Sequence, residues 1–227
     1  MNGRPFFDVA WVAGHVPLIL ERLVQHLELT VIPIVLGLVI SLAIALAVVS
    51  RPRAYAVVVA VAGILYTIPS LAAYLLVSRL TGLSLLTAVI PLTTYTLLIL
   101  VRGIVAGLHA VPADALEAAE GMGYTPRQRL LRVELPLALP LIVASIRLAT
   151  VTTIGLATVA SILGDTYGGF GQFLTEGLQT FFPTKIYLGA GLSVALAFVA
   201  DLALVRLERA ATPWTRGAAA TSGVASA

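Results

Sequence analysis

The chain has 227 residues, of which 59% are hydrophobic and only 11% charged, and its mean hydropathy is +1.00. This composition is typical of a polytopic membrane protein and exceeds what a soluble core requires. The chain contains no cysteine, which excludes a disulfide framework and a thiolate metal site. The pI near 9.5 comes from Arg residues and a single Lys spread along the chain, a pattern that favours membrane orientation over nucleic-acid binding.

Residues 1–28 are expected to form a lead-in to the first span. Charged and polar residues interrupt this region, so the sequence predicts no cleavable signal peptide. Apolar residues recur at helical spacing over 16–27, which predicts a helix lying in the membrane interface; a simple lead-in is the alternative. We expect His15 and His26 to lie at this interface without a special role, because a lone histidine lacks the partners of a ligand or base.

Five apolar stretches reach the roughly 20 residues that a helix needs to cross the hydrocarbon core. The fourth is interrupted only by Arg147, and the fifth carries Asp201 near one end. The predicted fold is therefore all-α, a polytopic membrane protein with five transmembrane helices within residues 29–206. The tail at 210–227 is rich in Ala, Thr, Ser and Gly and is predicted to be disordered. The predicted spans are 29–50, 54–78, 80–101, 135–164 and 186–205.

A polar segment, residues 107–134, separates the third and fourth spans and is predicted to contain two short helices joined by a glycine turn. Asp114 followed by Glu117 has the spacing of a capping box, so the first helix is expected to start at Asp114. Gly123 follows this helix and suits the left-handed conformation that closes one. A Thr, a Pro and a Gln at 125, 126 and 128 repeat the start signal, which predicts the second helix. The segment is typical of a docking element.

The spacing of residues in this segment resembles the EAA signature of binding-protein-dependent ABC importer permeases. The sequence departs from the signature only at Val133, where the family usually has Ile. In that family the segment is the cytoplasmic coupling helix, which sits in a groove of a separate ATPase subunit. A solvated helical hairpin between two spans is the alternative. The resemblance implies that the ATPase-coupling residues are Glu117, Ala118, Ala119, Gly123, Leu135 and Pro136.

The distribution of basic residues gives an independent prediction of orientation. With the 107–134 segment in the cytoplasm, most Arg residues fall on the cytoplasmic side, and only Arg4, Arg22, Arg79 and Lys185 fall outside. The positive-inside rule then places the N-terminus outside and the C-terminus inside a bacterial cytoplasmic membrane. Charge and motif therefore predict the same side for the coupling segment.

The outer connection, residues 164–185, is rich in glycine and predicts an irregular backbone. Phe173, Leu174, Leu178 and Phe181 are spaced as in a short helix along the outer surface. Two interpretations stay open, a gate loop facing the outside and a plain re-entrant turn.

In the second span, Pro69 lies mid-helix and predicts a kink. The run at 67–70, together with the stretches GMGYT and VELPLALP, resembles the osmoprotectant branch of the same family, whose members import glycine betaine, choline, carnitine or proline. The sequence departs from that branch at 165–167. The candidate pathway or gate residues are Tyr66, Thr67, Pro69, Ser70, Arg147 and Asp165.

Arg147 and Asp201 are the ionisable residues within the predicted spans, and such residues are costly unless paired or facing a cavity. We expect them to pair, although Arg147 lies roughly 18 Å from the start of its span and Asp201 only roughly 6 to 8 Å from the inner end of its own. The spans supply no carboxylate dyad, no nucleophile with its base and no ligand cluster, so neither a catalytic site nor a metal site is predicted.

The resemblance implies a permease fold like that of the methionine importer, in a non-catalytic subunit that works by alternating access. Its implied partners are two copies of an ABC ATPase, a second permease (the same chain or a related one), an external substrate-binding protein, a small-molecule substrate and the lipid bilayer, without nucleic acid. No cofactor is expected in this chain, because ATP and Mg²⁺ belong to the ATPase. Three alternatives remain: a permease of the same family for another small solute, a secondary transporter or channel, and a membrane scaffold.

Overall fold

The computed structural model describes residues 6–161 and 168–213, and within them every regular element is helical. The elements in chain order are α1 (Val9–Gly14), α2 (Val16–Val48), α3 (Pro52–Thr67), α4 (Ser70–Thr81), α5 (Leu85–His109), α6 (Ala113–Gly121), α7 (Pro126–Arg129), the π-helical turn η1 (Leu130–Glu134), α8 (Leu135–Ala160), α9 (Gly171–Gln179) and α10 (Pro183–Ala211). By length and apolarity, four helices can cross a membrane: α2, α5, the continuous helix from α7 through α8, and α10. The bent pair α3 and α4 makes a fifth candidate span. The all-α class and the approximate span count agree with the sequence prediction.

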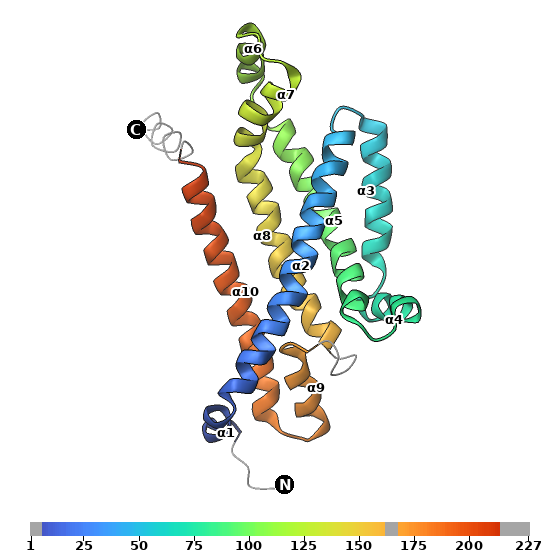
Figure 1. Ribbon diagram of the computed structural model, residues 1–227, viewed down its shortest axis with the longest axis vertical. Helices are drawn as coiled ribbons and strands as arrows, with labels where there is room; N and C mark the ends of the chain where they lie inside the picture. The colour runs from blue at the N-terminus through green and yellow to red at the C-terminus, as the bar shows by residue number, and fades with distance from the viewer. Residues whose placement is uncertain (1–5, 162–167, 214–227) are drawn as a thin grey trace, which may run out of the picture.

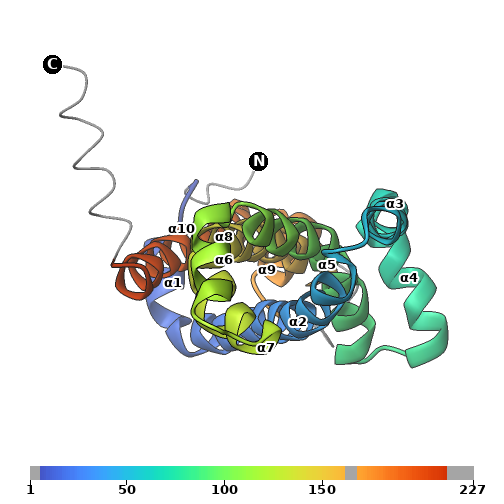
Figure 2. The same cartoon turned by 90° about the horizontal axis from the view of Figure 1, so that it is seen from above.

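The helices α2, α5 and α8 pack together to form the core, with α3 and α10 on opposite sides of it (Figures 1 and 2). Small residues allow this close packing. A Cβ added at Gly103 of α5 would lie 2.1 Å from the Cβ of Ser145 in α8, and one added at Gly37 of α2 would lie 1.9 Å from the Oγ1 of Thr96 in α5. Because lipid removes the hydrophobic drive between helices, such close backbone approach is a main source of their association.

The predicted interfacial helix over 16–27 is not a separate element. α2 runs without interruption from Val16 to Val48, so these residues form the first turns of the long first span. No Gly or Pro lies between Leu18 and Ile32 to divide the helix there, and His26, which we expected at the interface without a role, is fully buried. The preceding α1 is a short helix whose N-terminus is capped by Asp8, which accepts from the Trp11 N–H at 2.9 Å.

The predicted kink at Pro69 is a complete break. α3 ends at Thr67, and α4 leaves at 94° to it. The residue before a proline is driven out of the α region, and Ile68 accordingly has φ −64° and ψ 125°. The Tyr95 hydroxyl of α5 donates to the carbonyl of Ile68 at 2.8 Å and satisfies the group that the break exposes.

The third span lies further along the chain than predicted. Gly82 turns the chain with φ 67°, so α5 begins at Leu85 and not at residue 80. It continues to His109, which places Arg102 inside the helix and not after it.

In the 107–134 segment, the predicted capping box at Asp114 and Glu117 is wrong. α6 starts one residue earlier with Pro112 at the N-cap, so Asp114 lies in the first turn and caps nothing. The second predicted start is confirmed, because Thr125 and Gln128 form a reciprocal capping box. This second helix is not a short isolated one, however, since η1 joins it directly to α8.

The short helix predicted between the fourth and fifth spans is confirmed as α9, and Phe173 on it is fully buried. Phe181, expected on the same helix, lies beyond its end with φ 51° and 89% of its surface exposed. Asp165 and most of the predicted tail at 210–227 lie outside the described residues.

Candidate functional site

The coupling segment forms one end of the molecule, where α6 and α7 project beyond α5 and α8 (Figure 1). Glu117, Ala118 and Gly123 are exposed, whereas Ala119 is fully buried and fixes α6 to the rest of the segment. Leu135 and Pro136, the last two signature positions, are half-buried in the first turn of α8. The signature therefore divides into an exposed part and a packed part.

Gly123 closes α6 in the left-handed conformation, with φ 77°. Its N–H donates to the Glu120 carbonyl at 2.9 Å, and the Tyr124 N–H reaches back to the Ala119 carbonyl at 3.1 Å. No atom lies within 4 Å of the position that a Cβ would occupy. The requirement for glycine at this position is therefore one of backbone conformation and not of space.

Arg129 joins the two helices of the segment. Its guanidinium forms an ion pair with Glu120 of α6, and its Nε donates to Glu134 Oε1 at 2.7 Å. Arg129 and Glu134 both lie on the helix that runs from residue 126 to residue 160, so the ion pair of Arg129 with Glu120 ties α6 to that helix.

A cavity of about 680 Å³ lies among α3, α5 and α8. Its described walls carry a cation, two phenols and two hydroxyls among apolar side chains. The lining residues are Tyr55, Tyr66, Leu98, Ile99, Arg102, Gly103, Ala106, Ala144, Ser145, Leu148 and Thr152.

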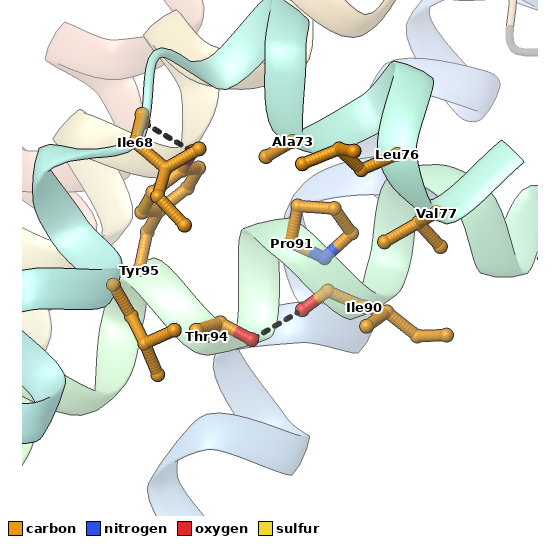
Figure 3. Close-up of a pocket in the computed structure, with 9 residues that line it drawn as sticks. Ile68, Ala73, Leu76, Val77, Ile90, Pro91, Thr94 and Tyr95 are labelled. Atoms are coloured by element: carbon orange, nitrogen blue, oxygen red, sulfur yellow. Dashed lines mark hydrogen bonds between the residues drawn. The ribbon is translucent and has the colours of Figure 1, made fainter.

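A second cavity, of about 150 Å³, fills the angle at the α3–α4 break and is almost entirely apolar (Figure 3). Tyr95 and Pro91 of α5 form one wall, and Ala73, Leu76 and Val77 of α4 face them. Tyr66 and Tyr95 meet edge to face, with ring centroids 5.6 Å apart and planes at 84°. This aromatic pair stands between the two cavities.

The predicted pathway residues fall into two places. Tyr66, Thr67, Pro69 and Ser70 cluster at the α3–α4 break beside these cavities, and Thr67 ends α3 by donating to the Ile64 carbonyl at 2.7 Å. Arg147 lies elsewhere, on the side of α8 that faces α10.

The predicted pairing of Arg147 with Asp201 is confirmed. The contact is bidentate, with Nε to Oδ1 at 2.9 Å and Nη2 to Oδ2 at 3.2 Å, and Glu208 adds a third contact at 3.5 Å. The expected mismatch in depth disappears because α10 continues to Ala211, so Asp201 lies roughly 15 Å from that end of the helix.

Sequence reasoning missed His26 and Glu208. His26 Nδ1 accepts from the Phe170 N–H at 3.2 Å, so its proton is on Nε2, which lies 3.2 Å from the Ile154 carbonyl. The ring also stacks on Phe170 at 4.9 Å. Both contacts join residues more than a hundred positions apart, which no local pattern encodes. Glu208 follows Asp201 by seven residues on α10, a helical spacing that could have indicated it.

Within residues 6–161 and 168–213, no group of three His, Asp or Glu residues could hold a metal ion. The described site offers an exposed docking surface, a continuous helix leading from it, and a cavity beside that helix. These features define the membrane subunit of a transporter driven from outside the chain.

Residues 34–212 match the family described as "Binding-protein-dependent transport system inner membrane component", and the chain belongs to this family. It is therefore a non-catalytic permease subunit of the ABC importer type, with ATP hydrolysis carried out by a partner ATPase. The family also implies a substrate-binding protein and a second permease subunit as partners.

Several relatives are similar over most of their length. The choline transport system permease protein OpuBB of Bacillus subtilis (strain 168) is 32% identical over 195 residues, which cover 86% of this chain and 89% of that protein. The carnitine transport permease protein OpuCB of Listeria monocytogenes is 34% identical, over 83% of this chain and 86% of that protein. The osmoprotectant import permease protein OsmW of Salmonella typhimurium (strain LT2) is 34% identical and covers 83% and 89%.

Among solved structures, an inward-facing conformation of the MetNI methionine ABC transporter superposes with a TM-score of 0.76 and 25% identity. The superposition covers 91% of this chain and all of the matched chain. The fold is thus that of the permease in this importer, as the sequence predicted.

Proposed function

We propose that this chain forms part of the translocation pathway of an ATP-driven importer for a compatible solute or quaternary amine, namely glycine betaine, choline, carnitine or proline. The observation that carries the proposal is the EAA register displayed on an exposed surface at one end of a continuous helix, in a chain whose named relatives transport choline, carnitine and osmoprotectants. The proposed permease domain is residues 29–206, with residues 107–134 as its coupling segment.

In the proposed mechanism, the two ATPase copies close on ATP and carry the coupling segments of two permeases with them. The exposed residues Glu117, Ala118 and Gly123 contact the ATPase, and Ala119, Leu135 and Pro136 hold the segment on α8. Arg129 passes the displacement to the 126–160 helix, which lines the cavity on its other side. The cavity then opens outward, receives solute from the binding protein, and faces inward again after hydrolysis. ATP and Mg²⁺ bind the ATPase.

The proposed orientation has α6, α7 and the end of α10 in the cytoplasm and α1 and α9 outside. These two groups lie at opposite ends of the molecule (Figure 1), and the Arg-rich loops fall on the α6 side, which supports this orientation. Because the chain contains no cysteine, single substitutions report it directly. Met122→Cys, at an exposed position beside α6, should react with an impermeant maleimide only from the cytoplasm, and Phe181→Cys only from outside. The reverse pattern would overturn the orientation.

The function is tested by purifying the chain from its native membrane with its partners and reconstituting the complex in proteoliposomes. We expect an ABC ATPase and a binding protein to co-purify, and uptake of radiolabelled glycine betaine, choline, carnitine or proline to need ATP on the ATPase side. Uptake driven by an ion gradient without ATP would indicate a secondary transporter and overturn the proposal. ATP-driven uptake of an unrelated solute would retain the importer and overturn its substrate class.

A further inference from the structure

The cavity among α3, α5 and α8 has an aromatic end and a cationic wall. Tyr66 and Tyr55 both line the cavity from one face of α3, but they are eleven residues apart, roughly 16 Å along the helix axis, so only Tyr66, which contacts Tyr95, lies at the aromatic end. On α5, Tyr95 precedes Arg102 by seven residues, so these two also share a face, roughly 10 Å apart along the axis. The edge-to-face contact with Tyr95 fixes the ring of Tyr66, which stays 38% exposed.

Arg102 differs from Arg129 and Arg147 in its contacts. Arg129 and Arg147 are each held by two carboxylates. Arg102 is exposed, and within residues 6–161 and 168–213 it has no ion-pair or hydrogen-bond partner, although it lies about two turns inside α5. None of the described lining residues is acidic. A guanidinium at such a place needs water or an anionic ligand, and its planar fork matches a carboxylate.

The two ends of the cavity select a particular charge pattern. The face of a tyrosine ring attracts a quaternary ammonium group, and this attraction grows when water is excluded. An unpaired guanidinium on the adjoining wall attracts a carboxylate and repels a cation that carries none. Ser145 and Thr152 supply hydroxyls on the α8 wall. A solute with both an ammonium and a carboxylate group is therefore attracted at both ends of the cavity. A quaternary cation without a carboxylate is attracted by the tyrosine and repelled by the arginine.

We propose that this cavity is a solute-binding half-site that prefers zwitterionic quaternary ammonium compounds, with the ring of Tyr66 against the ammonium group and Arg102 on the carboxylate. The inference rests on the proposed function and goes further, since it ranks glycine betaine above choline at the permease itself. The second permease subunit closes the half-site from the opposite side.

Binding is measured without the binding protein, so that its selectivity does not contribute. The complete permease–ATPase complex in nanodiscs, free of nucleotide, is titrated with radiolabelled glycine betaine and with choline. We expect glycine betaine to bind about tenfold more tightly, as one charge-assisted hydrogen bond to Arg102 provides. Equal or tighter binding of choline by the unmodified complex overturns the proposal, as does the absence of binding of either solute.

Two substitutions separate the two ends. Arg102→Gln should weaken the binding of glycine betaine about tenfold and leave the binding of choline unchanged or tighter. Arg102→Lys should retain most of the preference for glycine betaine. Tyr66→Leu should weaken the binding of both solutes. Tyr66→Phe keeps the ring and should weaken the binding of neither solute by more than about twofold. The matched controls are Arg53→Gln on α3 and Tyr187→Phe on α10, both outside the cavity lining. Equal effects of Arg102→Gln on both solutes would overturn the assignment.

The nanodisc result is independent of the uptake assay. If any of the four solutes is taken up with ATP but the nanodisc assay shows no binding preference, the half-site is contradicted and the proposed function is retained. A failure of ATP-driven uptake removes the proposed function itself. The comparison of the two solutes on the unmodified complex decides the proposal even where a variant fails to assemble.

Discussion

At the α9 end of the molecule a methyl group added to Gly168 or Gly171 would collide with neighbouring atoms, whereas at the α6 end Gly121 and Gly123 have open space around them. A Cβ on Gly171 would lie 2.0 Å from the Thr158 carbonyl oxygen, and one on Gly168 would lie 1.9 Å from Gln25 Oε1. At Gly121 and Gly123 nothing lies within 4 Å of the same position. The α9 end therefore needs glycine for space at Gly171 and for both space and a positive φ at Gly168, whereas Gly123 at the α6 end needs it for backbone conformation alone.

The contacts of the two regions differ in the same way. At the α9 end, Gln25 and His26 of α2 accept hydrogen bonds from the N–H groups of Gly169 and Phe170, which fixes the chain beside α9 to the first span. At the α6 end, the exposed surface is held from behind by Ala119 and by the ion pairs of Arg129. The comparison shows a tightly packed α9 end and an α6 end whose outer surface is exposed.

The largest loss of stability is expected for Gly171→Ala. Its methyl group meets the backbone of α8, which cannot yield as a flexible side chain can, so the free energy of unfolding should fall by roughly 3 kcal/mol or more. The measurement is the thermal midpoint of the purified complex in detergent. Gly191→Ala on α10 is the control, because nothing lies within 4 Å of that position, and it should be neutral or slightly stabilising. Equal midpoints for both variants would show that the contact between Gly171 and α8 is not tightly packed.

His26→Ala should have the next largest effect. It removes both hydrogen bonds of the ring and leaves the buried Phe170 N–H without its acceptor, a cost of about 2 kcal/mol. The thermal midpoint of the purified complex measures this loss. His15→Ala is the control, since that ring bonds to the Trp11 carbonyl and stacks on the Trp11 indole, four residues away. A larger fall in the midpoint for His15→Ala than for His26→Ala would contradict the role of His26 in fixing the chain beside α9 to α2.

A smaller effect is expected for Arg147, whose side chain is 31% exposed and partly screened. Arg147→Ala leaves Asp201 and Glu208 without their common cation and should lower the midpoint by a few degrees. Combining it with Asp201→Asn should recover part of that loss. Arg206→Ala, on the same helix as Asp201, serves as control. Strictly additive losses would show that α8 and α10 are not coupled through this pair.

Sequence predicted several local features, although the local pattern at Asp114 and Glu117 gave a wrong helix start. The capping box at Thr125 and Gln128 needs only four residues, and the apolar spans need only composition. The break at Pro69 shows the limit: proline predicts a distortion, but its size depends on Tyr95, which satisfies the Ile68 carbonyl from another helix. The long extension of α10 likewise depends on packing beyond its apolar stretch.

In the candidate site too, local spacing could be read from the sequence, whereas contacts between distant residues could not. The positions of the EAA signature could be located from the sequence because they have a fixed spacing, and their coupling role stays a prediction. The role of His26 was not, since its partners Ile154 and Phe170 lie more than a hundred residues away. Arg102 was assigned to a loop because the apolar stretch ends at residue 101, while the helix that carries it continues for two more turns.

The central claim, that the α6 end is a lever moved by an ATPase, is tested most directly with Gly123→Val in the reconstituted importer. Valine at φ 77° costs about 1 kcal/mol or more in strain at an exposed turn, so the complex should still assemble. We expect ATPase stimulation by the binding protein and solute uptake to fall together to background, while Gly121→Ala, at an unstrained neighbouring position with open space, keeps both. A stably assembled Gly123→Val importer with normal uptake and normal stimulation would contradict the account.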